Sequence, residues 1–173
     1  MEQWGFLIDT ENCVGCRACE IACKNRNKLG VGPRLRQVFV LENGEFPDTV
    51  VTNISMGCMH CGSPACVEVC PAGAISKRSE DGAVLVDKDK CIGCHYCFFA
   101  CPFGIPTYRG DGTMIKCDLC ADRREMGLDP ACAHTCFYDA LEAGPLDELA
   151  TIAREKIARR LAGSTQPSLI LIQ

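Results

Sequence analysis

The apolar residues of this chain fall into short runs that alternate with polar and cysteine-rich loops. Trp4–Ile8 and Ala83–Asp87 have the length and composition of single β-strands. Val38–Leu41 and Val50–Ile54 flank the turn signal Asn43-Gly44, and so predict a hairpin with a long loop. The pattern therefore predicts short strands that carry the chain from one loop to the next.

A helical pattern marks the C-terminal part of the chain. Asp147 is a suitable capping residue for a helix running to about Leu161, because apolar side chains recur on one stripe and Gly163 provides a stop signal. The following segment, Pro167–Gln173, contains four consecutive apolar residues. It is too short to anchor in a bilayer, so we predict a strand or a docking segment for another subunit.

The spacing of the cysteines is the strongest chemical signal. Residues 91–102 contain the run C-x2-C-x2-C-x3-C-P, which wraps an iron–sulfur cluster. Three thiolates of such a loop bind irons of one cubane, while the fourth, after a longer gap and before a proline, ligates a neighbouring cluster. The first quartet has the same x2, x2, x3 spacing, the second has x4 in place of the second x2, and the fourth is split. The four quartets are Cys13, Cys16, Cys19 and Cys23; Cys58, Cys61, Cys66 and Cys70; Cys91, Cys94, Cys97 and Cys101; and Cys117, Cys120, Cys132 and Cys136.

The cysteines have two alternative uses. The fourth quartet is split into two distant pairs, and a zinc ion with four cysteine ligands is its alternative. A disulfide framework suits small secreted proteins, but no secretory leader precedes these cysteines. Because sixteen thiols divide into four cubanes only if the last quartet takes part, we predict four [4Fe–4S] clusters.

A short repeat follows three of the quartets. Pro71–Ile75, Pro102–Pro106 and Phe137–Leu141 each follow a last cysteine and predict one turn leading into a short strand. Phe137 occupies the position where the other two segments have proline. The backbone there lacks the conformational restriction of a proline ring, but no cysteine ligand is lost.

Several polar residues lie within or beside the cysteine loops. His60 lies inside the second quartet, where four cysteines already complete the ligand set, so we predict a hydrogen-bonding or surface role rather than ligation. Arg17, Lys24, Arg26 and Lys28 surround the first quartet. We predict solvated surface for them, with an effect on the potential of a cluster as the alternative.

Composition makes the clusters part of the predicted core. The apolar fraction of 47% includes the 16 cysteines, and the chain has only 1 Trp, 3 Tyr and 7 Phe. Small domains with little hydrocarbon to bury are commonly held by metals, so we expect iron removal to unfold the chain. The formal charge of −4 becomes more negative when cysteines ligate as thiolates, which excludes nucleic acid as the expected partner.

The expected location follows from two absences in the sequence. No apolar stretch approaches the ~20 residues of a membrane-spanning helix. The N-terminal residues lack the basic region and cleavage pattern of a signal peptide. We therefore expect a cytoplasmic chain, or one that is membrane-associated or exported as a passenger of its partner.

Two pairings of the quartets are open, and they differ in which cluster receives the last cysteine of each quartet as its fourth ligand. The second and third quartets match the two-cluster motif best, and the crossover of the fourth cysteine leaves the first and fourth quartets to pair around them. Sequential pairing, first with second and third with fourth, is the alternative. The nested arrangement predicts these ligand sets: Cys13, Cys16, Cys19 and Cys136; Cys58, Cys61, Cys66 and Cys101; Cys91, Cys94, Cys97 and Cys70; and Cys117, Cys120, Cys132 and Cys23.

With these motifs, the chain resembles the iron–sulfur subunits of the dimethyl sulfoxide reductase family. The most specific segments are Trp4–Asp9, Asp87–Tyr108, Lys116–Arg123 and Gly144–Leu149. The resemblance implies a four-cluster electron carrier paired with a molybdenum or tungsten bis-pterin catalytic subunit, with a membrane anchor subunit as a possible further partner. It also implies the nested arrangement of ligands.

The predicted fold is α+β and consists of two intertwined ferredoxin-like modules. Its expected parts are an outer module (4–32 plus 103–145), a hairpin insertion (33–57), an inner module (55–102) and a C-terminal helix with a docking tail (146–173).

The predicted function is electron transfer without substrate chemistry. The sequence has no nucleophile–base pair or phosphate loop, and a cubane ligated by four cysteines has no open iron. The alternatives are a carrier subunit of a formate dehydrogenase, hydrogenase or carbon monoxide dehydrogenase complex, and a structural zinc protein.

Overall fold

The computed structural model describes residues 2–154, 158–160 and 169–172. Its helices are α1 (Ala18–Arg26), α2 (Ala65–Glu68), α3 (Tyr96–Ala100), α4 (Ala121–Glu125), α5 (Ala131–His134) and α6 (Leu146–Ala153). Its strands are β1 (Trp4–Asp9), β2 (Arg36–Asn43), β3 (Val50–Gly57), β4 (Ile75–Lys77), β5 (Val84–Val86), β6 (Thr107–Tyr108), β7 (Met114–Ile115), β8 (Leu141–Pro145), β9 (Ala158–Arg160) and β10 (Leu169–Ile172). Small helices and short strands together make the α+β class predicted from the sequence.

Two similar arrangements recur in different parts of the chain. In one, β1 pairs antiparallel with β8, and α1 packs against α5. In the other, β4 pairs antiparallel with β5, and α2 packs against α3. Each arrangement therefore combines a strand pair with two helices that carry cysteines. Strands β4, β6 and β8 follow the last cysteines of three quartets, which confirms the predicted repeat.

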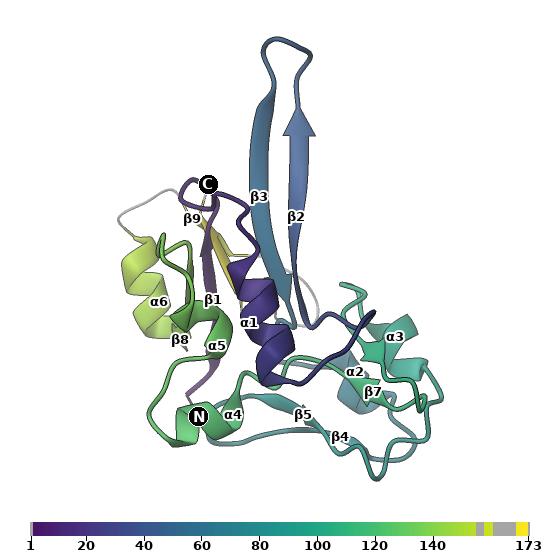
Figure 1. Ribbon diagram of the computed structural model, residues 1–173. Coiled ribbons are helices and arrows are strands. Elements are labelled where there is room, and N and C mark those ends of the chain that lie inside the picture. The colour runs from purple at the N-terminus through teal and green to yellow at the C-terminus, as the bar shows by residue number, and fades with distance from the viewer. Residues whose placement is uncertain (1, 155–157, 161–168, 173) are drawn as a thin grey trace.

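The predicted hairpin is present and longer than the apolar runs that predicted it. Strands β2 and β3 pair in register from Arg36 opposite Gly57 to Asn43 opposite Val50, and they project away from the rest of the chain (Figure 1). Val38 is buried at the base of the hairpin, whereas Phe46 in its loop is 92% exposed. The hairpin thus joins the core at one end and presents apolar side chains to solvent at the other.

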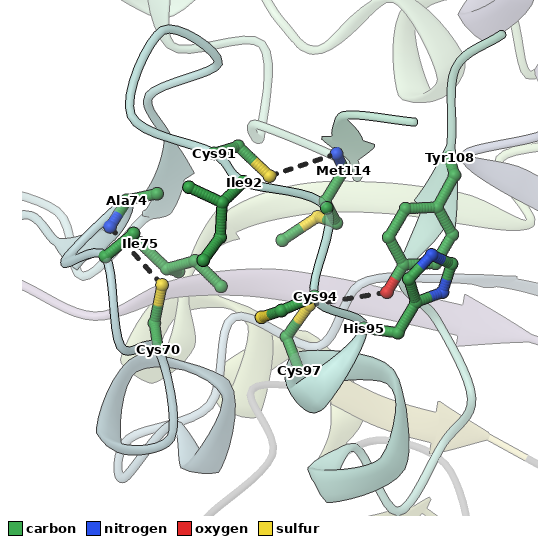
Figure 2. Close-up of a pocket in the computed structure, with 12 residues that line it drawn as sticks. Cys70, Ala74, Ile75, Cys91, Ile92, Cys94, His95, Cys97, Tyr108 and Met114 are labelled. Carbon is green, nitrogen blue, oxygen red and sulfur yellow. Dashed lines mark hydrogen bonds between the residues drawn. The ribbon is translucent and has the colours of Figure 1, made fainter. Parts of the chain in front are cut away.

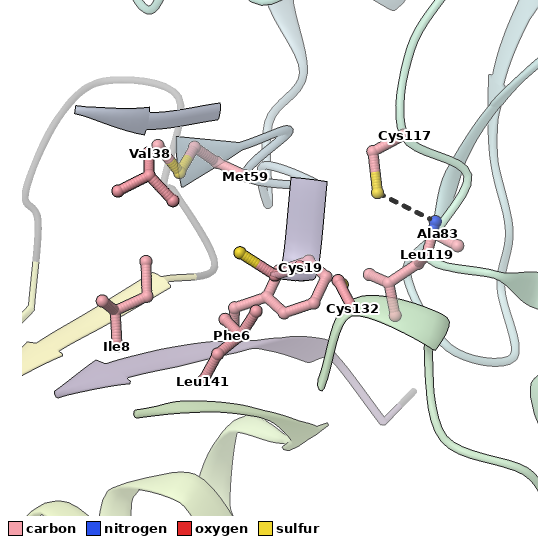
Figure 3. Close-up of a cluster of buried hydrophobic side chains, with 10 residues drawn as sticks. All are labelled: Phe6, Ile8, Cys19, Val38, Met59, Ala83, Cys117, Leu119, Cys132 and Leu141. Atoms are coloured by element: carbon pink, nitrogen blue, oxygen red, sulfur yellow. Dashed lines mark hydrogen bonds between the residues drawn. The ribbon is translucent and has the colours of Figure 1, made fainter. Parts of the chain in front are cut away.

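Cysteines form part of the main core. Its buried residues are Phe6, Ile8, Cys19, Val38, Met59, Ala83, Cys117, Leu119, Cys132 and Leu141 (Figure 3). They come from strands, helices and loops distant in the sequence, so the centre of the molecule is shared between hydrocarbon side chains and the residues expected to hold iron.

The C-terminal prediction was wrong in its helix and correct in its strand. Helix α6 begins at Leu146 after Pro145, without a side-chain cap from Asp147, and ends at Ala153 rather than near Leu161. Residues 158–160 are strand β9, which pairs with β10; Gly163 lies outside the described residues. The apolar pattern of the sequence extends beyond Ala153, but the helix ends there because the residues of β9 pair with β10 in the sheet instead. Strand β10 lies between β1 and β9 in the order β8-β1-β10-β9, with β1 and β10 parallel.

Across the described ranges, no helix has both the length and the apolar character needed to cross a bilayer.

Candidate metal centres

All sixteen cysteines lie in the described part of the chain, and none of them forms a disulfide. Within that part, no three His, Cys, Asp or Glu side chains converge as ligands of a single metal ion. Thiolates of a cubane bind different irons, so they surround a volume rather than a point. The relevant question is therefore which cysteines surround a common space.

One such space is lined by Cys70, Cys91, Cys94 and Cys97, named here the Cys91 set (Figure 2). The cavity has about 340 Å³ of space, part of it open to solvent. Three of its thiols come from one quartet and the fourth, Cys70, from the preceding quartet. Thiols from two quartets around one cavity fit the ligand requirement of a [4Fe–4S] cluster.

A second cavity, with about 380 Å³ of space that is partly open to solvent, is lined by Cys13, Cys16, Cys19 and Cys136, the Cys13 set. The loop after β1 and helix α1 supply three of these thiols, and the chain just after α5 supplies the fourth. Pairing of β1 with β8 and packing of α1 on α5 bring these distant segments together.

The two loops adopt the same local backbone. Gly15 and Gly93 have φ of 68° and 66°, and Arg17 and His95, which precede helices α1 and α3, have φ of 61° and 65°. The left-handed backbone conformation of these residues turns the chain so that successive cysteines face one cavity. A side chain at Gly93 would place its Cβ 2.8 Å from the carbonyl oxygen of Gly112, so the loop requires glycine.

The remaining eight cysteines make up two further sets under the predicted nested arrangement, and the pKa shifts of two buried thiols, Cys66 and Cys23, show which cysteines lie near them. Burial raises the pKa of Cys66 to about 12; Lys116 opposes the rise, and Cys58, Cys101 and Cys61 add to it. These four are named the Cys58 set.

The other four cysteines are Cys23, Cys117, Cys120 and Cys132, the Cys117 set. Burial raises the pKa of Cys23 to about 12, with Cys132 and Cys120 among the groups that add to the rise. Such thiols are protonated in the metal-free chain, and ligation must release their protons.

The four sets follow one another in space. Burial is the largest cause that raises the pKa of Cys117 well above its usual value. Among the charged groups, nearby Cys58 raises this pKa most. Burial likewise raises the pKa of Cys19, and Cys132 contributes. Cys66 packs on the same small apolar cluster as Cys91 and Cys97. The Cys58 set thus lies next to the Cys91 set, the Cys117 set next to the Cys58 set, and the Cys13 set next to the Cys117 set. The two exposed cysteines, Cys94 and Cys16, belong to the sets at the two ends of this row.

Hydrogen bonds reach several of the sulfurs. Backbone N–H groups of Ala74, Met114 and Leu119 donate to the Sγ atoms of Cys70, Cys91 and Cys117, each at 3.3 Å. The hydroxyl of Tyr108 lies 3.6 Å from Cys97 Sγ, and its ring stacks on His95 (Figure 2). Hydrogen bonds to the sulfurs raise the reduction potential of an iron–sulfur cluster by stabilising added negative charge.

The second quartet's histidine is structural. His60 is fully buried; its Nδ1 accepts from the Val84 N–H at 2.9 Å, and its carbonyl oxygen accepts from Gln3 at 3.0 Å. Burial, followed by the charges of Lys116 and Arg124, lowers the pKa of His60, so its ring is neutral. The predicted hydrogen-bonding role is confirmed, and the surface alternative was wrong.

Arg26 corrects another surface prediction. Its side chain is only 17% exposed and pairs with Asp118 at 2.7 Å and with Asp122. This joins the end of α1 to the loop of the fourth quartet. The sequence gives no signal for the pairing because the partners lie far along the chain.

Comparison with known proteins places this geometry in a family. The model of a 4Fe-4S dicluster domain matches residues 50–146, and that of a 4Fe-4S binding domain matches residues 4–25. The chain is 44% identical over 156 residues to the probable anaerobic dimethyl sulfoxide reductase chain YnfG of Escherichia coli K12, which covers 85% of this chain and 76% of the relative. The chain belongs to the iron–sulfur subunits of the dimethyl sulfoxide reductase family.

Other relatives of this iron–sulfur subunit extend the match. The thiosulfate reductase electron transfer subunit PhsB of Salmonella typhi is 43% identical over 84% of this chain and 78% of its own length. The formate dehydrogenase iron-sulfur subunit of Wolinella succinogenes is 36% identical over 92% of this chain and 90% of its own length. The iron–sulfur subunit is therefore an electron carrier, and its sixteen cysteines fit four [4Fe–4S] clusters.

Replacing Gly93 by alanine is expected to cost the iron–sulfur subunit the cluster of the Cys91 set, about four of about sixteen irons. The added Cβ collides with backbone at Gly112 and must move the loop that carries Cys91 and Cys94. Gly104→Ala is the matched control, because Gly104 has a similar φ of +60° but nothing within 4 Å of an added Cβ. Iron analysis of both purified variants measures the difference, and equal iron contents would contradict the prediction.

Proposed function

We propose that the iron–sulfur subunit carries electrons along its four cysteine sets, in the order given above, to or from a molybdenum or tungsten bis-pterin catalytic subunit. The observation that supports this most is that two cavities each combine three cysteines of one quartet with the last cysteine of another. This is the nested arrangement, with the Cys91 and Cys58 sets in an inner ferredoxin-like module and the Cys117 and Cys13 sets in an outer one.

A bound [4Fe–4S] cluster accepts and releases one electron at a time. The chain's own residues hold the thiols in position, bury the Cys117 set and donate hydrogen bonds to sulfur. Cys23, Cys117, Cys120 and Cys132 are all buried, which shields the middle of the route. Exposure of Cys94 and Cys16 at the ends of the row suits exchange of electrons with partners.

Exposed apolar side chains surround both ends of the row. Ile92 and Phe99 beside the Cys91 set are 68% and 81% exposed, and Val14 and Phe137 beside the Cys13 set are 54% and 91% exposed. Exposed apolar surface of this kind marks contact sites for other proteins. We therefore place one redox partner at each end, and we assign the projecting hairpin to contact with a partner subunit.

The relatives' names support a partner that performs the chemistry. Their printed names refer to dimethyl sulfoxide reductase, thiosulfate reductase and formate dehydrogenase. The iron–sulfur subunit is expected to serve a catalytic subunit of this group, with a reductase of a sulfur or sulfoxide compound as the first candidate. A formate dehydrogenase is the second, because that relative covers the largest share of the chain among the three.

Affinity purification of the tagged iron–sulfur subunit from its native host under anaerobic conditions tests the proposal. We expect a large subunit to co-purify with molybdenum or tungsten, and about sixteen irons per iron–sulfur chain. Metal analysis by mass spectrometry measures both. About twelve irons with one zinc would show that the fourth quartet binds zinc, and a complex without either pterin metal would overturn the proposed partner.

A further inference from the structure

A buried arginine lies near cysteines of both the Cys13 and the Cys117 sets. Arg36, the first residue of β2, is only 2% exposed. Its Nη1 donates to the carbonyl oxygen of Ser55 at 3.1 Å and to the Ser55 hydroxyl at 3.2 Å, and its guanidinium lies 4.2 Å from the centre of the Phe6 ring. An added Cβ at Gly57 would lie 3.2 Å from Arg36 Nη2, so the glycine leaves room for the side chain.

This positive charge has cysteines rather than carboxylates as its anionic surroundings. Among the described residues, no ion pair includes Arg36, and its Nη2 has no hydrogen-bond acceptor there. Burial acts to lower the pKa of Arg36, but the charges of nearby cysteines outweigh it and raise the pKa. These cysteines are Cys132, Cys117, Cys19 and Cys23, which belong to the Cys117 and Cys13 sets. A buried charge is costly unless anionic groups compensate it.

A hydrogen-bond relay links the same arginine to a single thiol. Ser55 Oγ lies 3.3 Å from Cys19 Sγ. Because arginine can only donate, Ser55 Oγ accepts from Arg36, and its hydroxyl hydrogen is left to donate to the sulfur. A ligating thiolate can only accept, which requires the same direction. Arg36 therefore acts on the Cys13 set through Ser55 as well as through its charge.

We propose that Arg36 is the internal counter-ion of the Cys13 and Cys117 sets and a positioning residue that raises the reduction potential of the clusters they bind. The inference rests on the ligand sets given under Proposed function. Reduction adds one negative charge to a cluster. A fixed positive charge in a poorly polarisable interior favours the reduced state, since little solvent screens the interaction.

The test is a redox titration of the purified complex, with each cluster followed by electron paramagnetic resonance. Arg36→Gln is expected to make reduction of the clusters of the Cys13 and Cys117 sets at least tenfold less favourable. Each tenfold change in the equilibrium constant equals 59 mV for one electron. The clusters of the Cys58 and Cys91 sets should keep their potentials. Arg36→Lys should restore most of the shift, because it keeps the charge.

Arg34→Gln is the matched control. It removes the same charge two residues away, but its side chain is 45% exposed and pairs with Glu20 at 3.6 Å, so solvent screens its effect. Ser55→Ala removes only the relay and should lower the potential of the Cys13-set cluster while leaving that of the Cys117 set unchanged.

Iron content separates the possible failures. Fewer than about sixteen irons in the unaltered subunit would overturn the four-cluster proposal itself. Full iron with unmoved potentials in Arg36→Gln would overturn the role of Arg36 alone. If Arg36→Gln cannot be loaded with iron, Arg36→Lys decides, because it keeps the charge at this position. Failure of Arg36→Lys to load iron, or a lowered potential of the clusters of both the Cys13 and Cys117 sets in that variant, overturns the proposal.

Discussion

Removing iron from the iron–sulfur subunit is expected to abolish its cooperative fold. The main buried core includes Cys19, Cys117 and Cys132 among its ten residues, so loss of the ligated metal leaves thiols around empty space at the centre. For structural zinc sites, metal binding contributes ~10–16 kcal/mol to folding, while a whole domain is typically stable by only ~5–15 kcal/mol. Loss of even one comparable site therefore removes most of the net stability.

Far-UV circular dichroism during a thermal scan measures this loss after anaerobic chelation or oxidative destruction of the clusters. The holo subunit should show a sharp transition, and the iron-free chain should show none. Rebuilding the clusters with iron and sulfide controls for irreversible damage by restoring the transition. A sharp transition in the iron-free chain would show that the hydrocarbon core is sufficient and would contradict our view of the clusters as core.

Combining Cys16→Ala with Cys136→Ala is expected to remove no more iron than either change alone. The two thiols line the same cavity although they come from the first and last quartets. Either change alone should therefore disable the same cluster, at most about four irons of about sixteen. Under sequential pairing, Cys16 and Cys136 serve different clusters, and their iron losses add.

The matched control combines Cys16→Ala with Cys23→Ala. Both residues belong to the first quartet, but Cys23 lies among the Cys117 set, where Cys132 and Cys120 add to its raised pKa. This pair should lose two clusters, so its iron loss should be about twice that of either single variant. Iron analysis and electron paramagnetic resonance of the five variants compare the outcomes. Additive loss in Cys16→Ala with Cys136→Ala would exclude the nested arrangement.

The longer strands β1, β2 and β3 were predictable because each is encoded by its own short segment, whereas β7 and β9 were not predicted. Trp4–Ile8 became β1, and the runs around Asn43-Gly44 became β2 and β3. The small helices α2 to α5 were not individually predictable, because four or five residues are too few for a helical period. Arg17 and His95 adopt the left-handed backbone conformation just before two of the helices that carry cysteines, and that conformation is too rare among residues other than glycine to be predicted from sequence.

The helix after Asp147 shows where a local pattern misleads. An apolar stripe continued toward Leu161, yet α6 ends at Ala153 and residues 158–160 pair with β10. The partner strand lies further along the chain, and no window over 147–161 contains it. A strand's stability depends on its neighbours more than on its own sequence.

The sequence by itself determined the kind and number of cofactors, because three quartets each lie in one continuous loop and the fourth consists of two closely spaced pairs 11 residues apart. Such spacing is a local property. It also determined that the chain transfers electrons. The fourth cysteine that lines each of the two cavities, the burial of His60 and the position of Arg36 near two cysteine sets were decided only by the tertiary structure. These features depend on β1 meeting β8 and on the hairpin base entering the core. Such contacts join segments distant in sequence, and their free energy comes from burial that no single segment can achieve alone.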